Sequence, residues 1–205
     1  MAIYILDYGM GNLRSVEKAF DFLGYRCQVI TSAEEAGEVD GIVLPGVGAF
    51  GKAVEELERR GYVDMVHECV GQGIPLLGIC LGFQLLFEES EESPGIRGLG
   101  LFAGRVKRLA GRVKVPHMGW NDVRWVKEHP IIQGVKSGSF FYFVHSYHPV
   151  PEEDGVTLGI TEYGTEFASA VSRGKTVGFQ FHPEKSSAVG LRILRNFALM
   201  CSKGM

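Results

Sequence analysis

Long apolar runs are absent from this sequence. No stretch approaches the roughly 20 apolar residues that a helix needs to cross a bilayer, and the start at Met1-Ala2-Ile3-Tyr4 lacks the pattern of a signal peptide. We therefore expect a cytoplasmic protein without a membrane partner. The 205 residues, 45% of them hydrophobic and with a mean hydropathy of +0.07, suffice to bury a large core. We expect a single domain over residues 1–205.

An excess of charge of one sign is also missing. A net charge of -3 and a pI near 6.1 give no general attraction to phosphate backbones, so we expect no nucleic-acid partner. One stretch is locally basic, and apolar residues alternate with its cations, which are Arg105, Lys107, Arg108, Arg112 and Lys114. The alternation predicts the solvent-exposed face of a hairpin. A role in binding phosphate or a partner is the less favoured alternative.

Cysteines are few and widely spaced. The four cysteines, Cys27, Cys69, Cys80 and Cys201, form no C-x-x-C pair, which argues against a disulfide framework or a zinc site. Cys27 and Cys69 lie in apolar patterns and are predicted to be small core residues. His145 and His148 are poorly spaced for a metal on one strand face, and His67 and His129 are interpreted as surface residues. We expect neither a metal nor a cofactor.

The pattern that is present in the first half is an alternation of short apolar strands with amphipathic helices. A strand is predicted at residues 3–6 and a helix from Leu13 to Leu23, followed by further strands at residues 27–30, 42–44 and 76–79. After about residue 95, closely spaced strands are predicted instead, with a closing helix near the end. The expected fold class is α/β, with a mixed, largely parallel central sheet flanked by helices and an antiparallel extension in the second half.

The pentapeptide Gly78-Ile79-Cys80-Leu81-Gly82 follows an apolar strand and precedes a helical pattern at residues 83–87. This is the form of a nucleophile elbow, in which flanking glycines are needed because neighbouring chain leaves no room for a Cβ atom. A thiol at a helix N-terminus is also favoured as thiolate. The alternative is an unreactive core cysteine between two packing glycines.

A thiolate that attacks an amide needs an imidazole to protonate the departing nitrogen and a carboxylate to orient that imidazole. His182 and Glu184 supply both groups directly after a predicted strand at residues 177–181. The spacing of two predicts side chains on the same side of a strand terminus. His182 alone would be interpreted as an ordinary buried or surface histidine, but together with the elbow it predicts a catalytic base.

A glycine-rich loop, Pro45-Gly46-Val47-Gly48-Ala49-Phe50-Gly51, follows the predicted strand at residues 42–44. It matches G-x-G-x-x-G formally, but the acidic residue expected about 20 positions later at the end of a strand is missing, because residues 62–70 have a helical pattern. We therefore interpret the loop as flexible backbone whose N–H groups face a developing oxyanion, together with the N–H of Leu81.

Residues 78–84, 181–184 and 45–48 together resemble the class I, triad-type glutamine amidotransferases. Within that class, residues 7–12, 116–121, 143–147 and 182–186 are similar to the glutaminase subunit of imidazole glycerol phosphate synthase. The resemblance runs from residue 3 to about residue 200. It implies a flavodoxin-like fold and hydrolysis of L-glutamine to glutamate and ammonia through a thioester on Cys80.

The resemblance also implies roles for other residues. Cys80, His182 and Glu184 would form the triad, and Val47, Gly48 and Leu81 the oxyanion hole. The substrate would be held by Gly46, Gln84, Ser146 and Tyr147. The partner would be a (β/α)8 cyclase subunit that takes up the ammonia in histidine biosynthesis, contacted by Asn12, Pro116, His117, Met118, Trp120, Asn121 and Lys185.

Three alternatives remain at this point. The ammonia could serve the synthesis of anthranilate, pyridoxal phosphate or purines, although residues 7–12 and 116–121 argue against this. The chain could be a regulatory module with a vestigial site, which an intact triad disfavours. It could also be a stand-alone cysteine hydrolase or peptidase, which would act fully without a partner.

Overall fold

The central feature of the fold is a nine-stranded sheet that takes strands from both halves of the chain. A computed structural model describes residues 1–202. The sheet order is β2-β1-β3-β4-β12-β11-β10-β7-β8, and the first five strands pair in parallel. These strands are β1 (Ile3–Leu6), β2 (Cys27–Ile30), β3 (Gly41–Gly46), β4 (Leu76–Cys80) and β12 (Thr176–Phe179). The predicted single domain over residues 1–205 stays a prediction, since residues 203–205 lie outside the described range.

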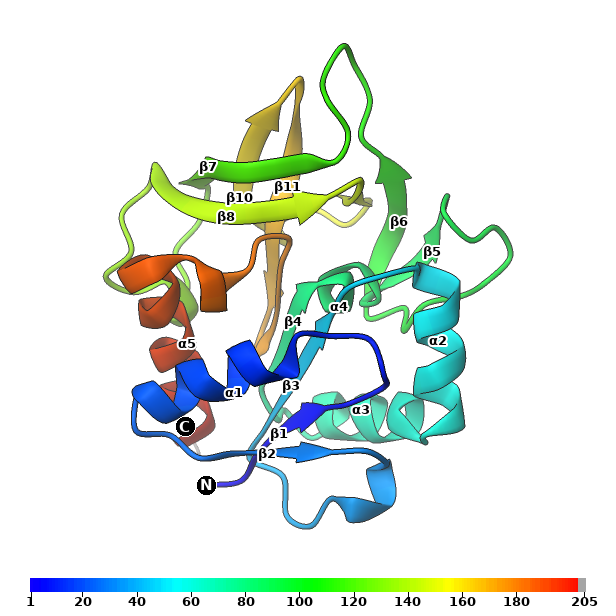
Figure 1. The fold of residues 1–205 in the computed structure, drawn as a ribbon, viewed down its shortest axis with the longest axis vertical. Helices are drawn as coiled ribbons and strands as arrows, with labels where there is room; N and C mark the ends of the chain where they lie inside the picture. Colours follow the sequence, from blue (N-terminus) through cyan, green and yellow to red (C-terminus); the bar gives the residue numbers. More distant parts are fainter. Residues whose placement is uncertain (203–205) are drawn as a thin grey trace.

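Helices cover both faces of the parallel part, as the alternating strand residues require (Figure 1). One face packs against α1 (Leu13–Phe22) and α5 (Ser187–Ser202), the other against α2 (Phe50–Arg59) and α3 (Tyr62–Gly71). In β1, Ile3 and Ile5 belong to the first core, whereas Tyr4 and Leu6 belong to the second. Successive side chains of a strand point to opposite faces, so one apolar run supplies both cores.

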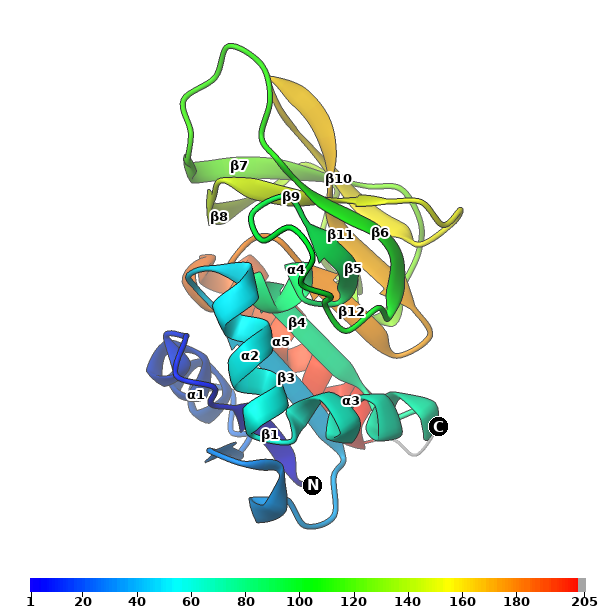
Figure 2. The ribbon, with the colours of Figure 1, turned by 90° about the vertical axis from the view of Figure 1, so that its right-hand side faces the viewer.

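The second half adds antiparallel strands (Figure 2). Four of them extend the main sheet: β11 (Thr165–Arg173), β10 (Thr157–Tyr163), β7 (His117–Trp125) and β8 (Ser139–His145). A three-stranded sheet, β5 (Phe87–Ser90), β6 (Phe102–Arg108) and β9 (Tyr147–Pro151), lies beside them. Short helical turns complete the fold: α4 (Leu81–Gln84), η1 (Ala33–Glu35), η2 (Pro130–Ile132) and η3 (Pro183–Lys185). The predicted fold class is confirmed. No helix among residues 1–202 is long and apolar enough to span a membrane.

Four local predictions were wrong. The basic stretch is not a hairpin: β6 ends at Arg108 and pairs with β5 and β9, and residues 109–116 form no regular element. The predicted helix at residues 83–87 stops at Gln84, because Phe87 joins β5. Cys27 packs against the first core, as predicted, but is only partly buried. His129 is half-buried and structural, since its Nδ1 accepts a hydrogen bond from the Ile131 N–H and so caps the start of η2.

The glycines around Cys80 generate the first prediction. A Cβ atom on Gly82 would lie 1.7 Å from the carbonyl oxygen of Leu44, which is rigid backbone in β3. We expect Gly82→Ala to lower the free energy of unfolding by at least about 3 kcal/mol, measured by urea denaturation. Gly71→Ala is the control, because a Cβ atom there meets nothing within 4 Å. It should change stability by less than about 1 kcal/mol, and equal effects of the two variants would contradict the steric argument.

Candidate active site

Cys80 lies at the carboxyl end of β4, where the chain turns sharply into α4. Its φ of 55° and ψ of -106° are outside the regions that a side chain other than glycine prefers. Gly78 makes the turn possible, because a Cβ atom there would lie 2.8 Å from the carbonyl oxygen of Gly82. The predicted elbow is therefore present, although the helix that follows is only one turn long.

His182 and Glu184 follow β12, which is the neighbour of β4 in the sheet. The prediction that both side chains lie on the same side of a strand terminus was wrong. His182 directly precedes the 3-10 turn η3, and Glu184 lies within it. His182 Nδ1 lies 2.8 Å from Glu184 Oε1, and both side chains are nearly fully buried. Nδ1 therefore donates to the carboxylate, and Nε2 is left as the basic nitrogen. No residue in 1–202 offers Nε2 a hydrogen bond.

Buried hydrogen bonds hold this turn to β8. The Ser186 hydroxyl donates to the His182 carbonyl oxygen at 2.6 Å and accepts from the Tyr142 N–H at 3.0 Å. The His182 N–H donates to the Tyr142 carbonyl oxygen at 2.9 Å. Gly190 lets α5 pack closely against the turn η3, because a Cβ atom on Gly190 would lie 1.9 Å from the Pro183 carbonyl oxygen. The position of the imidazole is thus set by β8 and α5 together.

The electrostatics of His182 suit a base that becomes charged. Burial lowers its pKa, but the neighbouring Cys80 sulfur and the Glu184 carboxylate outweigh burial and raise the pKa to about 10. An imidazolium is therefore stabilised between the Cys80 sulfur and the Glu184 carboxylate. The Cys80 sulfur lies 3.8 Å from the Val144 carbonyl oxygen and 3.9 Å from Gln180 Nε2. This arrangement can deliver a thiolate to an electrophile and a proton to a leaving group.

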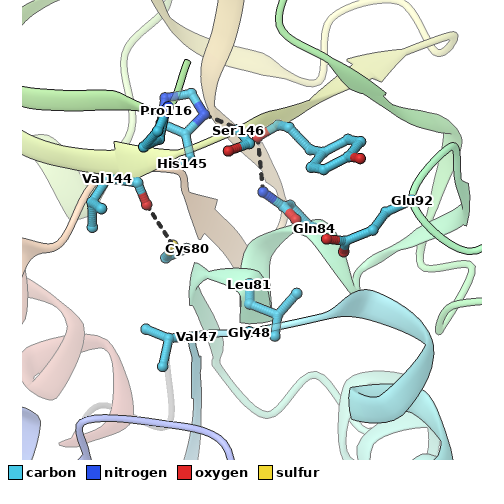
Figure 3. A pocket seen from close by; sticks show the side chains of 11 residues that line it. Val47, Gly48, Cys80, Leu81, Gln84, Glu92, Pro116, Val144, His145 and Ser146 are labelled. Atoms are coloured by element: carbon cyan, nitrogen blue, oxygen red, sulfur yellow. Dashed lines mark hydrogen bonds between the residues drawn. The ribbon is translucent and has the colours of Figure 1, made fainter. Parts of the chain in front are cut away.

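A cavity opens above Cys80 (Figure 3). Most of the residues predicted to act on the substrate line it, together with others from β8, from the loop after β5 and from the segment before β7: Val47, Gly48, Cys80, Leu81, Gln84, Glu92, Pro116, Val144, His145, Ser146 and Tyr147. Within residues 1–202, no group of three or more His, Cys, Asp or Glu side chains is placed to hold a metal ion.

The comparisons with known proteins now identify the family. The model of the family Glutamine amidotransferase class-I matches residues 4–201. The chain belongs to the class-I glutamine amidotransferases. It is 53% identical over 195 residues to the imidazole glycerol phosphate synthase subunit HisH of Moorella thermoacetica, covering 95% of this chain and 93% of the relative. The corresponding subunit of Aquifex aeolicus is 48% identical over 204 residues and covers 99% of each chain.

Solved structures agree on the fold. A glutamine amidotransferase crystal structure matches with a TM-score of 0.74 and 22% identity, covering 98% of this chain and 99% of the other. The structure of PurLQS from Thermotoga maritima matches with a TM-score of 0.78 and 17% identity, covering 97% of each chain. The curated relatives confirm the predicted function, the glutaminase subunit of imidazole glycerol phosphate synthase.

Several predicted site residues are placed differently from the expectation, and His182 and Glu184 are not among the residues that line the cavity. Gly46 does not line the cavity; it is buried at the end of β3, where a Cβ atom would lie 1.9 Å from the Tyr8 hydroxyl oxygen. His117, expected to face a partner, is only 3% exposed. The other predicted partner contacts are exposed or half-exposed: Asn12, Pro116, Met118, Trp120, Asn121 and Lys185.

Several residues of this amidotransferase site were missed. Glu92 lines the cavity, and its carboxylate also accepts the Phe50 N–H at 2.8 Å at the start of α2. Gln180 is fully buried beside the Cys80 sulfur. A polar residue inside the apolar run at residues 177–181 was a signal that could have found Gln180. No local pattern distinguishes Glu92 from its acidic neighbours in the loop.

Two buried histidines near the cavity predict a pH dependence of stability. Burial lowers the pKa of His117 to about 4, and burial together with the nearby imidazoles of His117, His148 and His182 lowers that of His145 to about 3. Their ordinary pKa is about 6.5. Between these values the unfolded chain binds protons that the folded chain does not, so stability is lost as the pH falls below about 6.5.

We expect the free energy of unfolding to fall less between about pH 7 and about pH 5 in His145→Asn than in the unsubstituted protein. Urea denaturation at each pH measures the slope. His67→Asn, which removes an exposed imidazole on α3, is the control and should keep the full slope. The same slope in all three proteins would show that His145 is not held neutral by the fold.

Proposed function

We propose that the chain hydrolyses L-glutamine through a thioester on Cys80 and passes the ammonia to a synthase partner. The carrying observation is the buried pair of His182 and Glu184 beside a cysteine in a strained elbow. The thiolate attacks the side-chain amide carbon, and His182 gives its proton to the departing ammonia. The same imidazole then takes a proton from the water that hydrolyses the thioester, while Glu184 fixes its orientation.

The cavity supplies groups for the rest of the substrate. Gln84, Ser146 and Tyr147 line it, as expected for residues that hold glutamine, and the Glu92 carboxylate suits the α-ammonium group. The N–H of Leu81 directly follows the nucleophile and supports the proposal that it donates to the oxyanion. Val47 and Gly48 lie across the cavity from Gln84 and would complete the oxyanion hole.

The proposed partner surface is the outer face of β7 and β8. Met118, Trp120 and Phe140 are 63%, 52% and 56% exposed there, and large apolar side chains gathered on one face favour a protein interface. Pro116 joins this face to the cavity. Lys185 lies on the same side, with its Nζ 5.9 Å from the ring centroid of Tyr142.

We propose that this face binds the (β/α)8 cyclase subunit of imidazole glycerol phosphate synthase, with Asn12 and Asn121 at its margins. Support comes from the curated relatives, each described as a subunit of that enzyme. We also retain the proposal of a cytoplasmic location. It is supported by the four cysteines, all free thiols, which suit a reducing compartment.

Replacing the nucleophile tests the mechanism. Cys80→Ala should abolish glutamine-dependent synthesis by the assembled complex, a loss of at least about 10⁴-fold, because only the thioester step needs the thiol. Synthesis from added ammonium should remain close to that of the unsubstituted complex. Cys69→Ala is the matched control, since this buried cysteine lies in α3, away from the cavity. Glutamine-dependent turnover by Cys80→Ala would refute the assignment of the nucleophile.

The conformation of the loop after β3 leads us to expect that the partner controls the rate of glutamine hydrolysis. The Val47 N–H donates to the Met10 carbonyl oxygen at 3.4 Å, so in this structure it is turned away from the site of the oxyanion. Gly48 has a φ of 113°, and a glycine at this position lets the adjoining peptide rotate at low cost. The absence of one oxyanion donor typically slows the reaction about 10²–10³-fold.

We therefore expect the isolated chain to bind glutamine and hydrolyse it slowly. A partner that carries its own ligand should raise the rate by about 10²-fold or more. The measurement compares glutaminase rates for the chain alone, with the empty partner and with the liganded partner. Three equal rates would contradict gating by this loop and would leave the triad assignment intact.

A further inference from the structure

Two buried histidines that the mechanism does not use form a contact behind the wall of the cavity. His117 of β7 and His145 of β8 are directly paired in the sheet register, and His117 Nδ1 lies 2.9 Å from His145 Nε2. Their exposed fractions are 3% and 6%. We propose that these two imidazoles form a neutral hydrogen-bond chain with fixed tautomers that positions the Tyr147 carbonyl and, through it, Gln84. The proposal rests on the glutaminase function.

The direction of every bond in this chain follows from its end. His145 Nδ1 lies 2.9 Å from the Tyr147 carbonyl oxygen, which can only accept, so Nδ1 carries the proton. A neutral ring has one N–H, and His145 Nε2 is therefore an acceptor. His117 Nδ1 must then be the donor to it. His117 Nε2 is left as an acceptor, and Asn121 Nδ2, a donor, lies 3.3 Å away.

The amide of Asn121 is itself oriented by two other bonds. Its Nδ2 also donates to the Glu162 carbonyl oxygen at 2.9 Å, and its Oδ1 accepts the Asp122 N–H at 2.9 Å. The chain thus has a determined donor at one end and a determined acceptor at the other. A proton added to either imidazole would place two N–H groups face to face, which agrees with the lowered pKa values of both rings.

Aromatic packing prevents the His117 ring from turning. The ring stacks on Tyr163 at a centroid distance of 4.0 Å and on Phe143 at 4.8 Å, with interplanar angles of 19° and 21°. A third aromatic ring, that of Phe167, meets its edge at 6.2 Å. These contacts hold the ring plane, so the Nδ1–H of His117 stays directed at His145.

The far end of the chain reaches the substrate-binding residues. The Tyr147 carbonyl oxygen also accepts from Gln84 Nε2 at 2.9 Å, and the same amide nitrogen donates to Gln180 Oε1 at 3.2 Å. Both N–H groups of Gln84 are then used within the protein, which leaves its carbonyl oxygen for a donor on the substrate. Figure 3 shows Gln84 and His145 on the wall of the same cavity. His117, which does not reach the cavity, is thus a positioning residue for substrate binding.

The tautomers are tested directly on the unsubstituted protein. We expect ¹⁵N NMR of the imidazoles at neutral pH to show both His117 and His145 uncharged, with the proton on Nδ1 in each ring. A proton on Nε2 of either ring, or a charged ring, would overturn the proposal. This measurement needs neither activity nor a partner, so it is independent of the proposed function.

Glutamine binding tests the consequence, in the Cys80→Ala background so that no turnover occurs. His117→Phe keeps an aromatic ring between Tyr163 and Phe143 but removes the donor. His145 Nε2 is then a buried acceptor without a partner, and the dissociation constant for glutamine should rise about tenfold. His117→Asn places an amide nitrogen near the position of Nδ1 and should restore binding to within about threefold. A merely structural role would not separate these two variants.

His129 provides the matched control. It is also partly buried and bonded to a backbone carbonyl, that of Gly174 at 2.9 Å, but it lies away from the cavity. His129→Phe should leave glutamine binding unchanged. Unchanged binding in His117→Phe, or equal weakening in His117→Phe and His129→Phe, would overturn the positioning role. If Cys80→Ala itself failed to bind glutamine, the proposed function would be wrong, while the tautomer measurement would still decide on the histidine chain.

Discussion

The backbone conformation of Cys80 is the constraint on which the rest of the site depends. A side chain at a φ of 55° costs of order 1–3 kcal/mol and persists only where the surroundings impose it. Here the strands β3, β4 and β12 impose this conformation, because Gly78, Gly82 and Gly178 let these strands pack directly against the turn at Cys80. Gly178 of β12 accepts the Phe83 ring where a Cβ atom would lie 2.2 Å from it. The strain places the sulfur above the carboxyl ends of the parallel strands, where an α/β sheet has its ligand crevice.

Strand β8 connects the parts of the site that the parallel strands cannot reach. Its Val144 carbonyl lies near the thiol, its Tyr142 backbone holds the turn of His182 through Ser186, and its His145 lines the cavity. The exposed apolar side chains of the proposed partner surface lie on the face of the β7 and β8 pair that also carries Tyr142 and Val144, because Trp120 pairs with Tyr142 and Met118 with Val144. A partner bound to this face would therefore lie next to backbone groups of the site.

His182 and His145 are buried to a similar extent, and the difference between their pKa values comes from their neighbours. His182 has a sulfur and a carboxylate beside it, and its pKa is raised to about 10. His145 has other imidazoles and a backbone carbonyl beside it, and its pKa is lowered to about 3. Burial alone disfavours the charged form in both cases, so anionic neighbours make the difference. The charged form is thus favoured in His182, whereas His145 is held neutral.

The features that the sequence by itself determined are those that depend on local backbone sterics. The glycines around Cys80 predict the elbow wherever the strand is placed, and apolar runs of the right length predict the parallel strands. The chemistry that a thiolate nucleophile needs also led from Cys80 to His182 and Glu184, although the 3-10 turn that carries Glu184 was not foreseen.

Only the tertiary structure decided which distant residues meet. His117 and His145 are 28 positions apart and face each other because of the register between β7 and β8, which no local pattern specifies. The same holds for Gln180 beside the thiol and for Glu92 at the cavity, whose neighbours come from other strands. The basic stretch was misjudged for this reason, because alternation predicts an exposed strand face but not the strand it pairs with. Pairing and burial are collective properties of the packed chain, so they appear only when the whole fold is known.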